Sequence, residues 1–157
     1  MPRLRILVKG IVQGVGFRPF VYRAASEKNL KGYVRNIGDG TVEIVVEGGD
    51  GALTSFLDDL QHRRPSLSKI YDLKIVVDND DTPLTKFAIL ESSKIGFESG
   101  SIIPADVSIC DKCLQELYDP QNRRFRYFFI TCTDCGPRFT IIEEIPYDRP
   151  NTTMSTF

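Results

Sequence analysis

The sequence of 157 residues has one histidine, no tryptophan and no cysteine before position 110. Its only histidine, His62, lies in a charged segment, which argues against a Ser/His or Cys/His nucleophilic site. No apolar run is long enough for a signal peptide or a membrane span. Neither sign of charge dominates, with 20 Lys and Arg against 21 Asp and Glu, so no net field attracts nucleic acid or an anionic membrane. We therefore expect a soluble, cytoplasmic protein without nucleic-acid or membrane partners.

The four cysteines, absent from the first two thirds of the chain, form two Cys-x-x-Cys pairs with 18 residues between them. Disulfides are the less favoured use in a chain without an export signal. Four thiolates in two close pairs suit a tetrahedral metal site, most often zinc, and leave no open coordination position. A redox role would need a thioredoxin-like context, which the sequence lacks. The predicted ligands of this structural zinc are Cys110, Cys113, Cys132 and Cys135.

Residues 10–18, Gly-Ile-Val-Gln-Gly-Val-Gly-Phe-Arg, carry the strongest functional signal in the first half. Gly14 and Gly16 allow the backbone to curl and turn successive N–H groups toward one point, which the positive end of the following helix also faces. Arg18 adds a planar fork of donors that fits a phosphate. The spacing excludes a Rossmann fingerprint, which would need glycine in place of Pro19, and no Gly-Lys-Ser/Thr triplet of a Walker loop occurs. Taken alone, such a segment is more often a plain strand-to-helix turn, so other features of the chain must decide whether it binds a phosphate.

Hydrophobic periodicity along the first 90 residues predicts the order β-α-β-β-α-β with one extra strand. This order is typical of the α+β ferredoxin-like sandwich, an antiparallel sheet with two helices on one face. Asp50 is the expected cap of the second helix, which ends before Pro65. The predicted strands span residues 3–9, 33–37, 41–47, 70–77 and 85–90, and the first helix spans 18–30.

The Ser- and Gly-rich segment 92–104 predicts a domain boundary, so we expect a first domain at 1–91, a linker at 92–104 and a four-cysteine zinc module at 105–157. The module is too short for a large core, and a structural zinc can supply about 10 kcal/mol or more of folding energy. Within it, we expect a short helix through Leu114 and Leu117, and the alternation over residues 124–129 predicts a strand.

Two groups of motifs resemble known families. Residues 10–18, followed by Gly-Tyr-Val-Arg-Asn at 32–36 and Asp-Gly-Thr-Val at 39–42, resemble the acylphosphatase signature. The later motifs resemble the HypF family, the carbamoyltransferases of nickel–iron hydrogenase maturation. The resemblance covers nearly the whole chain and implies an N-terminal fragment, because HypF-like proteins continue with a second zinc module and two nucleotide-binding domains. The later motifs are Pro-Ala-Asp at 104–106, Cys-x-x-Cys-Leu at 110–114, Asp-Pro at 119–120, Arg-Arg-Phe-Arg-Tyr at 123–127 and Cys-Thr-Asp-Cys-Gly-Pro-Arg-Phe-Thr at 132–140.

The resemblance implies that the first domain hydrolyses carbamoyl phosphate to phosphate and carbamate. Domains absent here would then use ATP to transfer the carbamoyl group to HypE. Arg18 would bind the phosphate and stabilise its developing charge. Asn36 would hold the attacking water by one acceptor and one donor contact. The expected phosphate-binding residues are Gln13, Gly14, Val15, Gly16, Phe17 and Arg18, of which Phe17 acts through its backbone and places its ring in the core.

Other functions stay open at this point. The chain could be a non-catalytic scaffold whose zinc module docks onto HypE or the missing domains, or a stand-alone acylphosphatase with an appended zinc module. A basic and aromatic strip at residues 123–127 is also found in nucleic-acid-binding modules, but a solvated strand face and the balanced charge argue against that use. Turnover of an acyl phosphate would separate an enzyme from a scaffold.

Overall fold

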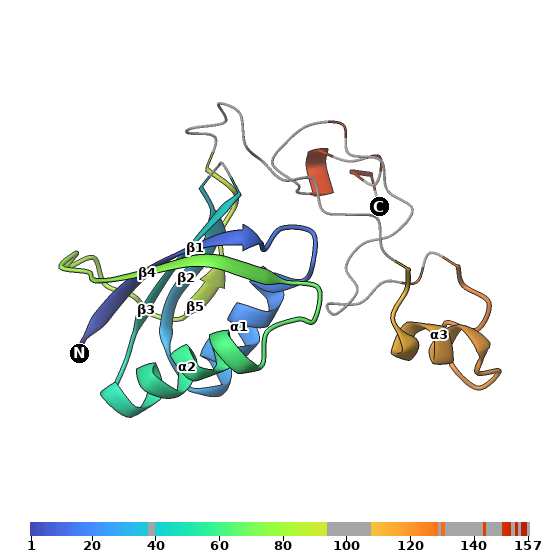
Figure 1. The fold of residues 1–157 in the computed structure, drawn as a ribbon, viewed down its shortest axis with the longest axis horizontal. Coiled ribbons are helices and arrows are strands. Elements are labelled where there is room, and N and C mark those ends of the chain that lie inside the picture. The colour runs from blue at the N-terminus through green and yellow to red at the C-terminus, as the bar shows by residue number, and fades with distance from the viewer. Residues whose placement is uncertain are drawn as a thin grey trace.

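The computed structural model describes residues 1–37, 40–93, 108–128, 130, 143, 149–151, 153, 155 and 156. A five-stranded sheet carries helices α1 and α2 on one face (Figure 1), which confirms the predicted ferredoxin-like fold. Residues 94–107 lie outside the described residues, so the predicted linker and domain boundaries stay predictions. The elements are β1 (Arg3–Ile11), α1 (Phe17–Glu27), β2 (Lys31–Asn36), β3 (Thr41–Glu47), α2 (Asp50–His62), β4 (Lys69–Val77), β5 (Phe87–Ile89), α3 (Asp111–Tyr118) and the 3₁₀ helix η1 (Arg149–Asn151).

The strand order in the sheet is β4-β1-β3-β2-β5. Neighbouring strands are antiparallel except for β2 and β5, which are parallel, so the prediction of a wholly antiparallel sheet is wrong at this one pair. The cause is the connection between β4 and β5, which crosses from one edge of the sheet to the other. Arg3 holds this connection, because its guanidinium donates hydrogen bonds to the carbonyl oxygens of Asp80 and Thr82.

The core lies between the sheet and the two helices. Directly paired residues point to the same face of a sheet, so the row Val34–Ile44–Ile6 and the pair Val42–Val8 all face α1 and α2. Burying such side chains contributes about 1.5–3 kcal/mol each. The helices supply Phe17, Phe20, Val21, Ala24, Leu53, Phe56 and Leu60.

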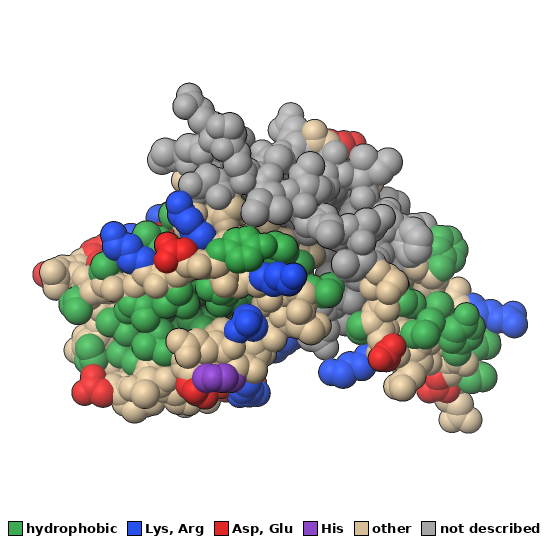
Figure 2. Space-filling view, in the orientation of Figure 1, with side chains coloured by type: hydrophobic (Ala, Val, Ile, Leu, Met, Phe, Trp, Pro, Cys, Tyr) green, Lys and Arg blue, Asp and Glu red, His purple; other side chains and the backbone are tan. Residues whose placement is uncertain are grey.

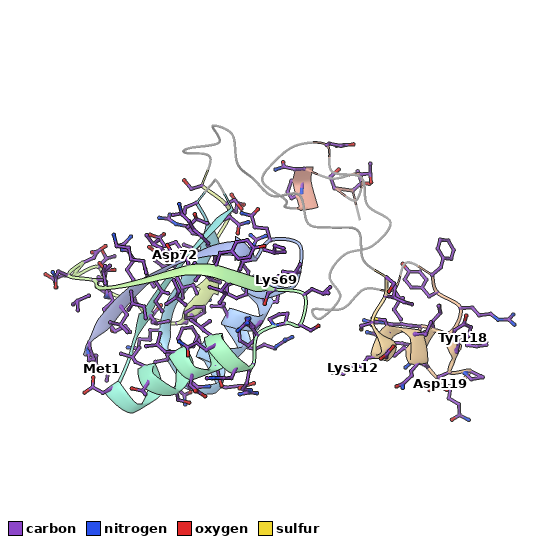
Figure 3. All side chains as sticks on the ribbon, viewed as in Figure 1. Met1, Lys69, Asp72, Lys112, Tyr118 and Asp119 are labelled. Atoms are coloured by element: carbon purple, nitrogen blue, oxygen red, sulfur yellow. The ribbon has the colours of Figure 1, made fainter. Side chains whose placement is uncertain are left out.

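The edge strand β4 contains one extra residue. Lys9 pairs with Asp72 and Gly10 with Ile70, so Tyr71 forms a bulge, bracketed in Figure 3 by the labelled Lys69 and Asp72. Figure 2 shows hydrophobic side chains gathered between β4 and α2, so α2 leaves part of this edge uncovered. Within the described part of the chain, no helix combines the length and the apolar character needed to cross a membrane.

Two local predictions are wrong. Gly49, rather than Asp50, is the N-cap of α2, and Asp50 is the first helical residue, where its charge favours the positive helix end. The described residues of 124–129 form turns instead of a strand, with Arg126 at a left-handed φ of 58°. The aromatic and basic side chains alternate there, but those at 125–128 are all exposed, so no buried face holds them in a sheet.

Candidate active site

The loop between β1 and α1 bends sharply over residues 13–16. Gly14 has a φ of 69° and Gly16 a φ of 74°, both in the left-handed region that side chains with a Cβ rarely adopt. Gly16 is the N-cap of α1, and its carbonyl oxygen accepts the backbone N–H of Phe20 at 3.1 Å. The two glycines are therefore required by the shape of the loop.

The backbone N–H groups of this loop make no hydrogen bond to the backbone of the described residues. Among the described residues, no carbonyl oxygen accepts a hydrogen bond from the amides of residues 13–17. The first turn of α1 also contains no acidic residue that would neutralise its positive end. Such a set of oriented donors at a helix N-terminus suits an anion.

The side chains of the loop anchor it. Val12, Val15 and Phe17 are buried in the core, and the Phe17 ring lies 6.0 Å from that of Phe20, as expected for a core residue. Gln13 is also buried, and Arg18, the second residue of α1, is half-buried. The buried anchors fix the backbone, so its amides are preorganised.

Asn36 is the last residue of β2 and is fully buried. It pairs with Val42, which pairs in turn with Val8, so its side chain faces the helix side of the sheet. Neither Oδ1 nor Nδ2 has a hydrogen-bond partner among the described residues. Leaving such a buried group unpaired costs about 1–3 kcal/mol. A buried amide of this kind suits a small polar ligand or a water molecule, which would supply the missing hydrogen bonds.

The sheet topology brings the loop and Asn36 to the same end of the sheet. Both β1 and β2 are antiparallel to β3, which lies between them, so the carboxyl ends of β1 and β2 lie at the same end of the sheet (Figure 1). Two strand spacings, about 10 Å, separate β1 from β2 there. The predicted phosphate loop and the predicted water-positioning residue thus lie on either side of the start of β3.

Comparison with known proteins identifies the first domain. Residues 4–89 match the acylphosphatase family model. The acylphosphatase of Oceanobacillus iheyensis is 38% identical over 89 residues, which are 57% of this chain and 98% of that protein. The chain belongs to the acylphosphatase family. Residues 109–142, beyond this acylphosphatase domain, match the HypF finger.

The chain is also similar to HypF proteins over nearly all of its length. The HypF protein of Methanocaldococcus jannaschii is 52% identical over 149 residues, which are 95% of this chain and 19% of that protein. The crystal structure of full-length HypF in the phosphate- and nucleotide-bound form has a TM-score of 0.87 at 43% identity, covering 99% of this chain and 20% of that chain. The chain therefore spans about a fifth of the length of these relatives. These matches confirm the resemblance to HypF indicated by the motifs.

Behind Asn36, on the face of the acylphosphatase domain away from the helices, lies a carboxylate that the sequence analysis did not single out. Glu43 is only 4% exposed and accepts hydrogen bonds from Arg5 and Arg35, both at 2.6 Å. Burial raises the pKa of the neighbouring Tyr33, and the charge of Glu43 raises it further. The available signal was that Arg35 and Glu43, of opposite charge, lie in consecutive predicted strands, 33–37 and 41–47. Arg35 is half-buried in this ion pair.

In the HypF finger, two of the four predicted metal ligands are described. Cys110 is the N-cap of α3 and Cys113 lies in its first turn, near the labelled Lys112 in Figure 3 and at the other end from Tyr118. Residues three apart lie on one side of a helix, so both sulfurs can face one point. Cys113 is buried and packs in a cluster with Ile130. Cys132 and Cys135 lie outside the described residues.

Proposed function

We propose that the acylphosphatase domain binds and hydrolyses carbamoyl phosphate, as the first step of a HypF-type carbamoyltransferase of nickel–iron hydrogenase maturation. One observation carries the proposal. The loop amides, which pair with no described carbonyl, lie at the same end of the sheet as the buried side-chain amide of Asn36, which has no partner among the described residues. The similar full-length HypF structure was solved in a phosphate- and nucleotide-bound form, which supports a phosphate site in this family.

In this proposal the amides of residues 13–17 and the guanidinium of Arg18 hold the phosphate group of the substrate. Charge develops on the phosphate as its bond to the carbonyl carbon breaks. Preorganised donors stabilise that charge more in the transition state than in the ground state, and loss of one such donor typically costs about 100- to 1,000-fold in rate. The left-handed glycines supply this preorganisation, because they let the loop keep its curled shape without strain.

Asn36 positions the nucleophile. Its Oδ1 accepts a hydrogen bond from a water molecule and its Nδ2 donates one, which aims the water at the carbonyl carbon. The water oxygen forms the new bond to carbon, the bond to the phosphate oxygen breaks, and phosphate leaves with the electron pair. One water proton passes to the phosphate and the other to solvent, which gives carbamate and phosphate. Since an acyl phosphate is already activated, placement and charge neutralisation suffice without a strong base.

We also propose that Cys110, Cys113, Cys132 and Cys135 hold a structural zinc ion. The matched HypF finger includes all four, and the two described cysteines share the start of α3. Ile130, two residues before Cys132, is buried against Cys113, which supports a second pair close to the first. When bound, the metal would supply folding energy to a module with a small core.

The later steps, ATP-dependent transfer of the carbamoyl group to HypE in the cytoplasm, belong to the proposal for a longer HypF protein. A second candidate function for this chain is a docking scaffold. It is favoured by the exposed aromatic side chains of Tyr118, Tyr127 and Phe128 in the finger. A chain that binds phosphate but releases none from carbamoyl phosphate would support the scaffold and contradict the hydrolase.

The test is phosphate release from carbamoyl phosphate by the wild type and by Arg18→Ala and Asn36→Ala variants. We expect Arg18→Ala to lose about 100- to 1,000-fold in kcat/KM. Asn36→Ala should lose kcat while it keeps affinity for inorganic phosphate. The control is Arg23→Ala, which removes an exposed arginine further along α1. Equal rates for the wild type and Arg18→Ala would remove Arg18 from the mechanism.

A further inference from the structure

Glu43 joins the three central strands of the sheet through one buried carboxylate. Its neighbours in β3, Val42 and Ile44, face the helices, so Glu43 faces the opposite side. Its Oε1 accepts from Arg5 Nη1 on β1 at 2.6 Å, and its Oε2 accepts from Arg35 Nε on β2 at 2.6 Å. We call this arrangement the Glu43 bridge.

The bridge lies one residue away from Asn36. Arg35 pairs with Glu43 across β2 and β3, and Asn36 pairs with Val42 in the next row. The guanidinium of Arg35 also lies over the Tyr33 ring, 5.3 Å from its centroid, which gives it a second support. Arg35 is therefore fixed on the outer face immediately before Asn36 turns to the inner face.

Asn36 depends on such support because its own side chain supplies none. Its amide has no hydrogen-bond partner among the described residues, and β2 ends at this residue. Successive residues of a strand point to opposite faces, so holding Arg35 outward holds Asn36 inward. An error of about 1 Å in the position of a catalytic group can cost about 100-fold in rate.

We propose that Glu43 is a positioning residue: by holding Arg35 and Arg5, it fixes the end of β2 and with it the amide of Asn36. This inference rests on the proposed function, in which that amide places the attacking water. If Glu43 only stabilised the fold, its removal would lower the stability and leave kcat of the folded chain unchanged. If Glu43 positions Asn36, its removal lowers kcat and leaves KM unchanged, because the phosphate is held by the loop after β1.

The test compares Glu43→Gln with Glu47→Gln in the 157-residue chain. Glu47 is a matched control, since it lies on the same strand and face, at the other end of the sheet, and accepts hydrogen bonds from Arg3 at 2.6 and 3.0 Å. We expect Glu43→Gln to lower kcat about 10- to 100-fold with KM unchanged, and Glu47→Gln to leave both unchanged. A normal kcat for Glu43→Gln, or equal losses in both variants, would overturn the inference.

Arg35→Gln provides a second variant that leaves Glu43 paired with Arg5. Arg35→Gln should reproduce the loss of kcat. The double variant Arg35→Gln/Glu43→Gln should be no slower than the slower single variant, because both substitutions break the same contact between Glu43 and Arg35. Additive losses would contradict the bridge. Should Glu43→Gln fail to fold, Arg35→Gln against the Glu47→Gln control decides the same question.

A readout without turnover separates this inference from the proposed function. The side-chain amide signals of Asn36 in a ¹⁵N–¹H NMR spectrum can be assigned by their loss in Asn36→Ala. We expect these signals to shift in Glu43→Gln and to stay in place in Glu47→Gln. A wild type that releases no phosphate would end the proposed function, whereas unmoved Asn36 signals in Glu43→Gln would end the positioning role.

Discussion

Lys28, at the end of α1, donates a hydrogen bond from its ammonium group to the buried carboxylate of Asp59 on α2. The same carboxylate contacts Arg63 Nη1 at 3.3 Å. The two helices that cover the sheet are thus joined by one charged cluster at the edge of the core. This cluster makes the stability of the domain depend on pH.

Replacing Asp59 with Asn should destabilise the fold near neutral pH. Burial alone raises the pKa of the Asp59 carboxyl, but the hydrogen bond and charge of Lys28, together with Arg63, lower it below its ordinary value of 3.8. A lowered pKa stabilises the folded state above the unfolded value, and this contribution is lost as pH falls through the folded value. We expect Asp59→Asn to lower the free energy of unfolding by about 2 kcal/mol at about pH 7. The difference from the wild type should shrink as pH falls through the lowered pKa of Asp59 in the folded state. Urea denaturation measures both, with the exposed Asp58→Asn as control, and a constant difference across pH would contradict this account.

Gly16→Ala should damage phosphate binding more than stability. A residue with a Cβ at a φ of 74° costs about 1–2 kcal/mol, so relief of the strain should displace the loop amides. Calorimetric titration with inorganic phosphate measures the affinity, and urea denaturation measures the stability of the same variant. An unchanged affinity would show that the curled loop is not the anion site.

Gly32→Ala and Gly51→Ala should change stability in opposite directions. A Cβ at Gly32 would stand 1.8 Å from the carbonyl oxygen of Val45, at a φ of 142°, so we expect a loss of at least about 3 kcal/mol. A Cβ at Gly51 on α2 meets nothing within 4 Å, and alanine there should add up to about 1 kcal/mol. Thermal and urea denaturation of the pair check the prediction, which a tolerated Gly32→Ala would refute.

Cys113→Ser should remove the zinc ion and unfold α3 while phosphate release continues. Loss of one thiolate weakens a four-sulfur site, and the small finger core cannot replace the lost binding energy. Metal analysis of the purified chain and far-ultraviolet circular dichroism measure the two effects. Gln115→Ser, on an exposed position of the same helix, is the matched control. Full metal content in Cys113→Ser would exclude Cys113 as a ligand.

The regular parts of the fold were predictable because each has its own periodicity. The alternation of Leu4, Ile6 and Val8 and the helical spacing of Leu53, Phe56 and Leu60 identify a buried face without knowledge of neighbours. The left-handed glycines of the loop were also predictable, since Gly14 and Gly16 precede a helix with proline in its first turn. The alternation of basic and aromatic residues near Phe125 led to the wrong prediction of a strand, because such alternation indicates a strand only where one face is buried.

What the sequence could not show depends on partners across the sheet. The burial of Asn36 comes from the row that it shares with Val42 and Val8, and the Glu43 bridge needs Arg5 from a strand 38 residues earlier. The parallel direction of β5 follows from a connection that crosses the whole sheet. These features arise from long-range pairing, for which a single sequence carries little signal.

The direction of β5 also decides where the chain leaves the domain. Since β5 runs parallel to β2, the backbone exits beside the end of β2, where the N–H of Ser93 donates to the carbonyl oxygen of Asn36 at 2.8 Å. Anything joined to the chain after Ser93 is tethered beside Asn36, and a short tether commonly gives an effective concentration in the millimolar range. A neighbour joined in this way would therefore stay close to Asn36 at a concentration far above that of the same module free in solution.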